Sequence, residues 1–283
     1  MKKLFLAPLL LSAALPVHAA VLGSWSQDET SGDLIDSTGN HVPGTATGAP
    51  SYAQPGVGNG TYGAITVQNA AGTSIEYGPS TEDEFFTIGA DNNSPIMNLD
   101  ASGSFTVMSW LNPMAPSSAS TYRFISTGSA GGADRGWGFG LRVTGADGTG
   151  SSLRFTTYGI ADNDSSLFNV TFGEWVHIAA TYDAGLITYY LNGVALDSDT
   201  SVFGNESANG RLVIGGRLGG NNVDQMNGRV DGIQVYDGVL DAGQIQNAAA
   251  MSVSVPEPSA LLIGLGAAGL FLIQRRARKS ASV

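Results

Sequence analysis

Turn-forming residues interrupt this chain every eight to twelve positions, and the runs between them are rich in β-branched and aromatic residues. Glycine alone accounts for 39 of the 283 residues. This spacing is typical of an antiparallel β-sandwich, and no internal repeat or long linker divides it. The sequence therefore predicts one all-β domain with a single short helix at 241–249. The predicted strands are 64–68, 73–77, 104–111, 122–127, 137–143, 153–158, 175–182, 187–196, 211–215 and 229–236.

Two of these segments also predict a register. Within 187–196, Asn192 and Gly193 suit the two positive-φ positions of a type I′ turn, so we expect a hairpin there. Within 105–111, apolar side chains occupy both faces, as in a strand whose outer face is covered by loops. They are Phe105, Val107 and Leu111 on one face and Met108 and Trp110 on the other.

Charge is distributed unevenly along the chain. The whole sequence has a net charge of −11, but residues 21–256 hold seven arginines, no lysine and 23 acids, a net charge of −16. A surface of this sign repels phosphate backbones, so we exclude nucleic acid as a partner. The absence of cysteine excludes disulfides and thiolate metal sites. An exported protein that holds hard cations fits this composition.

The first residues are typical of a secretory signal peptide, which we place at 1–19. Two lysines precede an apolar run, and Val17 and Ala19 are the small residues of a cleavage site. We expect signal peptidase and the secretion machinery to act here, so that the mature chain begins at Ala20 or Val21. A retained membrane anchor is the alternative, but the apolar run is shorter than the ~20 residues of a spanning helix.

The other end, 255–280, has three ordered parts. A short motif precedes an apolar helix at 260–273, and a basic tail follows at 275–279. At about 1.5 Å per residue the apolar run spans roughly 21 Å, so flanking residues must help it cross a ~30 Å hydrocarbon layer. Positive flanks stay cytoplasmic, which places the body of the protein outside the inner membrane. The motif is Val255, Pro256, Glu257 and Pro258, with the tripeptide 256–258 at its centre.

These three parts together resemble the PEP-CTERM sorting signal of Gram-negative bacteria. The resemblance implies that an exosortase recognises and removes the tail after a transient membrane-anchored stage. It also implies delivery to the cell surface or to the extracellular matrix. A permanent single-pass anchor is the alternative interpretation.

The segment from Trp175 to Asp183, with the Tyr-Tyr-Leu-Asn-Gly hairpin that follows, resembles laminin G-like domains of the concanavalin A-like lectin and glucanase superfamily. Four further segments agree in order, and we assign the domain to 21–250. The resemblance implies a jelly-roll β-sandwich. The sequence departs from the family pattern at Gly232, at Asp237-Gly238 and over 40–100.

Catalytic signatures are missing. A retaining glucanase needs two carboxylates about 5 to 5.5 Å apart, and glucanases of this superfamily carry them in a Glu-x-Asp-x-x-Glu run that this chain lacks. The cluster Glu82-Asp83-Glu84 has a different spacing and suggests a solvated loop. His177 is expected to be structural, and His41 has no motif around it. We therefore predict a protein without catalytic residues.

Two binding hypotheses remain. The resemblance implies a structural calcium ion, which prefers oxygen ligands, at Asp36, Asn40 and Asp231. The alternative is that these residues make side-chain turns and caps. Trp137 lies between glycines and is the candidate aromatic platform for a sugar ring, although an aromatic residue on a strand also suits the core.

Three classes of function follow. The first is a non-catalytic surface or matrix protein, carbohydrate-associated or adhesive, with exopolysaccharide as its partner. The second is a structural surface protein without a sugar ligand. The third is a polysaccharide hydrolase or lyase with an unrecognised site.

Overall fold

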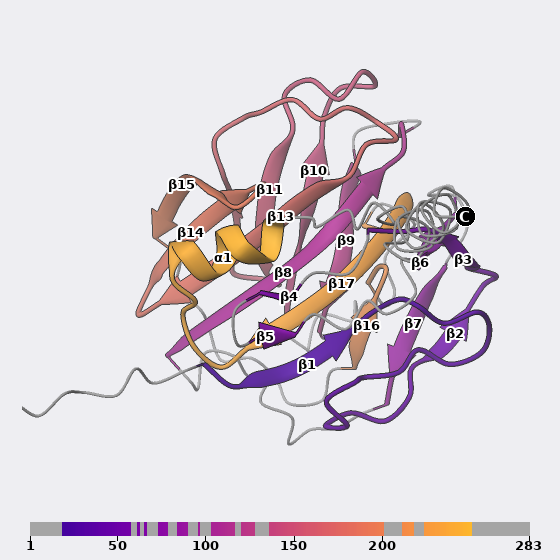
Figure 1. The fold of residues 1–283 in the computed structure, drawn as a ribbon. Helices are drawn as coiled ribbons and strands as arrows, with labels where there is room; N and C mark the ends of the chain where they lie inside the picture. The colour runs from indigo at the N-terminus through magenta and orange to yellow at the C-terminus, as the bar shows by residue number, and fades with distance from the viewer. Residues whose placement is uncertain are drawn as a thin grey trace, which may run out of the picture.

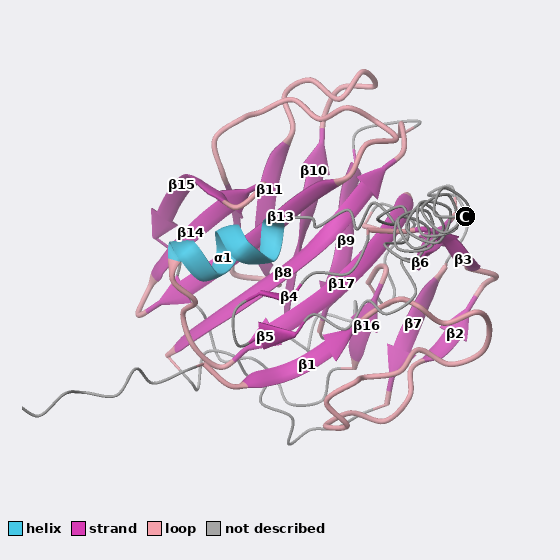
Figure 2. Cartoon of the chain, viewed as in Figure 1, coloured by secondary structure: helices cyan, strands magenta, loops and turns pink. Residues whose placement is uncertain are grey.

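Two antiparallel sheets packed face to face form the molecule (Figure 1). This is a computed structural model, and strands dominate it (Figure 2). The residues it describes are 19–57, 61–62, 65–66, 73–78, 84–89, 96, 103–116, 120–127, 136–200, 211–217 and 224–250.

The first sheet runs in the order β15-β14-β13-β8-β17-β6-β3, and β1 pairs with β17 beside this path. The long central strand β8 pairs antiparallel with β13 on one side and with β17 on the other. The bounds are β1 (Val21–Trp25), β3 (Ser51–Pro55), β6 (Thr73–Tyr77), β8 (Ser104–Pro113), β13 (Val176–Asp183), β14 (Leu186–Leu191), β15 (Val194–Thr200) and β17 (Gly228–Tyr236).

The second sheet runs in the order β12-β11-β10-β9-β16-β7-β2. A separate pair, β4 (Thr61–Tyr62) and β5 (Ile65–Thr66), lies outside both sheets. The bounds of the second sheet are β2 (Thr45–Thr47), β7 (Phe85–Ile88), β9 (Ser120–Ser126), β10 (Trp137–Val143), β11 (Ser152–Thr157), β12 (Ala161–Asp164) and β16 (Leu212–Ile214). The predicted antiparallel sandwich is confirmed.

Aromatic rings fill the space between the sheets. Phe105 of β8 stacks on Tyr182 of β13, with ring centroids 5.3 Å apart. Trp137 of β10 and Phe155 of β11 stack with centroids 5.5 Å apart and planes 8° from parallel. Buried aromatic side chains of this size stabilise a core strongly, because each removes a large apolar area from water.

The outer face of the first sheet carries a second apolar cluster. Helix α1 (Ala242–Ala249) lies across this face (Figure 1) and buries Ile245 against the sheet. Asp241 caps the helix through a reciprocal pair of hydrogen bonds with Gln244. The cluster comprises Met108, Ala179, Tyr190, Tyr236, Leu240, Ile245 and Ala248. The prediction that both faces of 105–111 are covered is thus confirmed, and a helix supplies part of the cover.

The predicted hairpin is confirmed as well. Asn192 and Gly193 have φ of 50° and 79°, and they join β14 to β15. The helix predicted at 241–249 is α1. The prediction missed β1, β2, β3, β4, β7 and β12. β12 has the sequence Ala-Asp-Asn-Asp, whose residues are depleted in strands. Pairing with β11 makes this segment a strand.

Several predictions fall outside the described residues. They are the signal peptide up to His18, including Val17, and the sorting motif at Val255, Pro256, Glu257 and Pro258 with the apolar helix and basic tail that follow it. Across the described ranges, which end at residue 250, no helix is long and apolar enough to cross a membrane. Ala19 is described and packs against the second apolar cluster.

Candidate functional site

Asp36 lies in the loop after β1, and its carboxylate is buried. Oδ1 accepts hydrogen bonds from the backbone N–H groups of Ser24 (2.9 Å) and Thr38 (3.0 Å). Oδ2 accepts from the Thr38 hydroxyl (2.6 Å) and from the backbone N–H groups of Asn40 (3.2 Å) and His41 (3.1 Å), and His41 Nδ1 lies 2.8 Å away. Burial opposes the charge, but hydrogen bonds from His41, Thr38 and Ser24 outweigh it and lower the pKa of Asp36 to about 2.

The other two predicted calcium ligands are also engaged by the protein. Asn40 donates its side-chain amide to the carbonyl of Leu22 (3.1 Å), and Asp231 Oδ2 accepts a hydrogen bond from the backbone N–H of Val57 (2.7 Å). Within the described residues, no three His, Asp or Glu side chains are grouped so that they could hold a metal ion. Six donors contact the Asp36 carboxylate, and calcium binding at Asp36, Asn40 and Asp231 stays a prediction.

Trp137 is a core residue. Its side chain has 0 % exposure, it stacks on Phe155, and its indole N–H donates to the carbonyl of Ile96 (2.9 Å). The ring is therefore closed to a sugar, which corrects the interpretation of Trp137 as a platform. The flanking glycines misled that prediction: the face of β10 that carries Trp137 points into the sandwich, and Gly138 lies on the opposite face.

His177 lies in the middle of the first sheet, beside Trp110, with ring centroids 5.1 Å apart. Burial without a charged partner lowers its pKa to about 3, so the imidazole is neutral at ordinary pH. Glu84 is also buried and accepts a hydrogen bond from the backbone N–H of Gly78, so this member of the acidic cluster is not solvated as expected. Glu82 and Asp83 lie outside the described residues.

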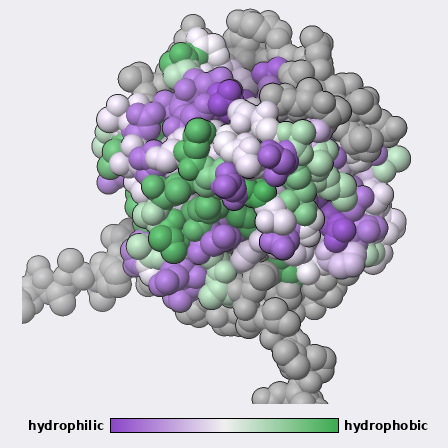
Figure 3. Space-filling view, turned by 90° about the horizontal axis from the view of Figure 1, so that it is seen from above, coloured by the Kyte–Doolittle hydropathy of each residue, from purple (hydrophilic) through white to green (hydrophobic). Residues whose placement is uncertain are grey.

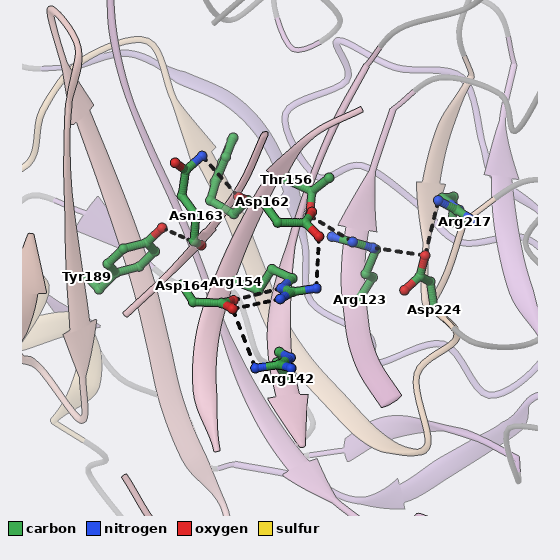
Figure 4. A network of polar contacts seen from close by, with 11 residues as sticks. Arg123, Arg142, Arg154, Thr156, Asp162, Asn163, Asp164, Tyr189, Arg217 and Asp224 are labelled. Atoms are coloured by element: carbon green, nitrogen blue, oxygen red, sulfur yellow. Dashed lines mark hydrogen bonds and ion pairs between the residues drawn. The ribbon is translucent and has the colours of Figure 1, made fainter. Parts of the chain in front are cut away.

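A chain of polar contacts crosses the outer face of the second sheet (Figure 4). At its centre Arg154 of β11 makes a bidentate contact with Asp164 of β12, with Nε to Oδ1 at 2.7 Å and Nη2 to Oδ2 at 2.6 Å. The same guanidinium donates to Asp162 (2.9 Å), and Arg142 of β10 lies 3.5 Å from Asp164. The carboxylates of Asp162 and Asp164 on edge strand β12 thus pair with arginines of β10 and β11.

The same series of polar contacts extends to β9. Arg123 donates to the hydroxyl of Thr156 (2.8 Å) and lies 3.7 Å from Asp224, which also pairs with Arg217 at 3.1 Å. Both guanidinium groups lie over the ring of Tyr158, at 5.3 and 5.2 Å from its centroid. Only 2 % of Arg123 is exposed. This network therefore joins strands and loops to one another, and we assign it a structural role.

A pocket of about 180 Å³ lies where the loop from β12 to β13 meets the β14–β15 turn. On the face seen from above, hydrophobic and hydrophilic areas lie side by side (Figure 3). Trp175, which immediately precedes β13, is partly exposed and lines the pocket. The other lining residues are Asn169, Val170, Thr171, Glu174, Val176, Leu191 and Asn192.

Backbone hydrogen bonds hold the walls of this pocket in place. Val170 N–H donates to the carbonyl of Gly148 (3.1 Å), and Gly173 N–H donates to that of Pro113 (2.9 Å). The Asn192 side chain accepts from the backbone N–H of His177 (2.9 Å), so the turn is fixed to the start of β13. A side chain at Gly148 would place its Cβ 2.2 Å from the Val170 carbonyl oxygen, which explains the glycine.

Several polar side-chain groups of the pocket lining can still form hydrogen bonds with a ligand. The Trp175 indole N–H, the side-chain amide groups of Asn169 and Asn192, the Thr171 hydroxyl and the Glu174 carboxylate can donate or accept hydrogen bonds. Among the described residues, nothing bonds to the Nδ2 atoms of either asparagine or to the Glu174 carboxylate. The pocket can therefore bind a small molecule with both donors and acceptors.

Sequence reasoning did not find this pocket. It placed Trp175 within a family signature and in a strand, and it left 169–171 unassigned. The sequence offered a weak signal: Glu174 directly precedes the predicted strand 175–182, and Asn192 lies in the predicted turn of 187–196.

Two antiparallel sheets packed face to face, with a short terminal helix, place the domain in the all-β sandwich class. Residues 88–246, more than half of the chain, match the laminin G family described as the concanavalin A-like lectin/glucanases superfamily, and the chain belongs to this superfamily. Residues 254–279 match the PEP-CTERM protein-sorting motif, which implies export and processing by an exosortase. No curated protein matches the chain.

Solved structures confirm the fold. Domain 4 of AbnA, an extracellular arabinanase from Geobacillus stearothermophilus in complex with arabinotriose, is 21 % identical, with 82 % of this chain and 99 % of that chain covered and a TM-score of 0.53. Trypanosoma rangeli sialidase in complex with sialic acid is 12 % identical, with 86 % of this chain and 35 % of that chain covered and a TM-score of 0.56. At these identities the likeness concerns the fold alone.

Proposed function

We propose that this protein is a non-catalytic, carbohydrate-associated component of the cell surface or extracellular matrix. The observation that carries the proposal is the presence, on one chain, of a concanavalin A-like sandwich and the sorting motif that follows it. The sandwich supplies a rigid scaffold for a saccharide, and the motif sends it to where exopolysaccharide lies. The arabinotriose complex of the similar AbnA domain supports a sugar ligand.

The chain's own residues support a non-catalytic role. Glu84 and Asp36 are buried and bonded to backbone N–H groups, and Asp162 and Asp164 are paired with Arg154. A glycosidase needs two carboxyl groups that face the same sugar bond. The carboxylates named here are committed to protein partners instead.

A glycan array probed with the purified full-length chain tests the proposal. We expect binding to a subset of neutral or bacterial polysaccharides and no release of reducing sugar from them. Failure to bind any glycan would favour a structural surface protein, and turnover of a bound polysaccharide would favour an enzyme.

The same array, repeated with EDTA, tests the calcium ion that the family resemblance implies. Because six donors contact the Asp36 carboxylate, we expect binding and melting temperature to stay unchanged. A loss of either on chelation, restored by Ca²⁺, would contradict this expectation.

Removal of the tail is tested in cells. With the exosortase gene intact we expect the protein in the surface or matrix fraction, and without it in the inner membrane. An unchanged membrane location in both strains would identify the tail as a permanent anchor.

A further inference from the structure

We propose that the pocket beside Trp175 is a binding site for a single neutral, hydroxyl-rich sugar unit. The inference rests on the proposed function and adds to it the place of binding and the class of ligand. Three separate stretches of the chain build the pocket, namely 169–171, 174–176 and 191–192. The polar network around Arg154 and Arg123 does not line this pocket.

The size of the pocket limits the ligand. Its volume of about 180 Å³ is well below the ~300 Å³ at which sites for drug-sized molecules begin. One sugar ring therefore fills it, and further units of a polysaccharide would extend into solvent. A terminal or side-branch sugar suits this geometry better than the interior of a buried chain.

The lining groups match the two surfaces of a sugar ring. Trp175 and Leu191 are the partly exposed apolar residues of the lining, and an indole can stack on the C–H face of a sugar ring. The amide groups of Asn169 and Asn192 offer N–H donors to hydroxyl oxygens, and the Glu174 carboxylate accepts hydrogen bonds from hydroxyl groups. Both donors and acceptors are needed, because each hydroxyl group can act as either.

Charge decides between neutral and acidic sugars. None of the eight lining residues is basic, and Glu174 is the one ionised group among them. The surrounding domain is strongly acidic, with a net charge of −16 over residues 21–256. A sugar carboxylate or sulfate would meet like charge without a cationic partner, so the site discriminates against uronic acids and sulfated sugars.

The pocket is preformed, which lowers the cost of binding. The hydrogen bonds of Val170, Gly173 and Asn192 to neighbouring strands and loops hold its walls before a ligand arrives. Rigid walls avoid the entropy loss of ordering a loop on binding.

Titration of the full-length chain with methyl glycosides tests the site. The probes are the methyl glycosides of glucose, galactose, mannose, arabinose and xylose, and methyl glucuronide is the acidic counterpart of the glucoside. We expect at least one neutral glycoside to bind, with a change in tryptophan fluorescence, and the glucuronide to bind about tenfold more weakly or not at all. Equal or tighter binding of the glucuronide would overturn the neutral class.

Variants locate the binding. Trp175→Ala should weaken the affinity at least about tenfold. Glu174→Gln and Thr171→Val alter exposed side chains, so the fold should be kept, and each should weaken the affinity about threefold or more. Asp183→Asn is the matched control, because Asp183 is an exposed acid at the opposite end of β13, and it should bind as the unaltered chain does.

The outcomes separate this inference from the proposed function. If the chain binds glycans on the array but Trp175→Ala, Glu174→Gln and Thr171→Val keep full affinity, the site is wrong and the proposed function stands. If the chain binds no methyl glycoside but does bind polysaccharide, the single-unit ligand is wrong. If it binds neither, both proposals fail.

Discussion

Two buried titratable residues, Asp36 and His177, make the stability of this domain depend on their surroundings. The Asp36 carboxylate accepts hydrogen bonds from β1 and from its own loop. His177 is a neutral imidazole buried in the first sheet. Such groups stabilise a fold only while their hydrogen bonds or their neutrality persist. Each therefore predicts a measurable stability effect.

Asp36→Ala should destabilise the domain by about 3 kcal/mol, since it leaves several buried donors of Thr38, His41 and Ser24 without an acceptor. Urea unfolding followed by tryptophan fluorescence measures the change. Asp33→Ala, an exposed acid in the same loop, should stay within about 0.5 kcal/mol of the parent. Equal effects of the two substitutions would contradict the role given to Asp36.

His177 should make stability depend on pH. Burial lowers its pKa from 6.5 to about 3 in the folded state. Between these values the unfolded chain binds the proton and the folded chain does not, so stability is full above pH 6.5 and is lost as the pH falls toward 3. Subtracting the urea-unfolding free energies of His177→Gln from those of the parent isolates this slope. A difference that does not change with pH would refute it.

At the scale of elements, α1 completes the outer face of the first sheet. The helix buries Ile245 and Ala248 over the second apolar cluster, and its capping box fixes its start. A short helix of this length is marginal alone in water, so packing holds it. Ile245 and Ala248 therefore supply part of the cover of this cluster.

Ile245→Ala should cost about 3 kcal/mol, because it opens a cavity between α1 and the sheet. Gln246→Ala, on the exposed side of the same helix, is the control and should change stability by less than about 0.5 kcal/mol. Thermal unfolding by circular dichroism distinguishes the two. A neutral Ile245→Ala would show that the helix does not contribute to the domain.

At the scale of the whole molecule, both sheets and α1 lie within residues 19–250. The sequence assigns the two ends beyond these residues to export and sorting. We therefore treat the sandwich as the functional body. Its strands pair residues far apart in sequence, such as β1 with β17, so its folding depends on long-range contacts.

A chain of residues 20–250 should unfold cooperatively, with a melting temperature within about 3 °C of the full-length chain in detergent. Differential scanning calorimetry of both chains measures this. Loss of the cooperative transition in the shorter chain would show that the terminal segments support the fold.

Local patterns predicted much of this architecture. Alternation and turn residues located the central strands, the hairpin at Asn192-Gly193 and the helix after Asp241, because these depend on neighbours along the chain. The edge strand β12 was missed, since its residues lack strand propensity and pairing with β11 makes it a strand. The internal strand β7 was missed although its residues Phe-Phe-Thr-Ile favour strands. Of the predicted site residues, Trp137 proved buried, whereas the calcium site at Asp36, Asn40 and Asp231 stays a prediction.

The sequence by itself determined the all-β class, the superfamily resemblance, the sorting motif and the acidic charge of the body. These follow from composition and short-range order. Only the tertiary structure decided which tryptophan faces the core and which lines a surface. Alternation separates the two faces of a strand without saying what covers each, and the Trp175 pocket joins segments that only the packing of the loop and the turn brings together.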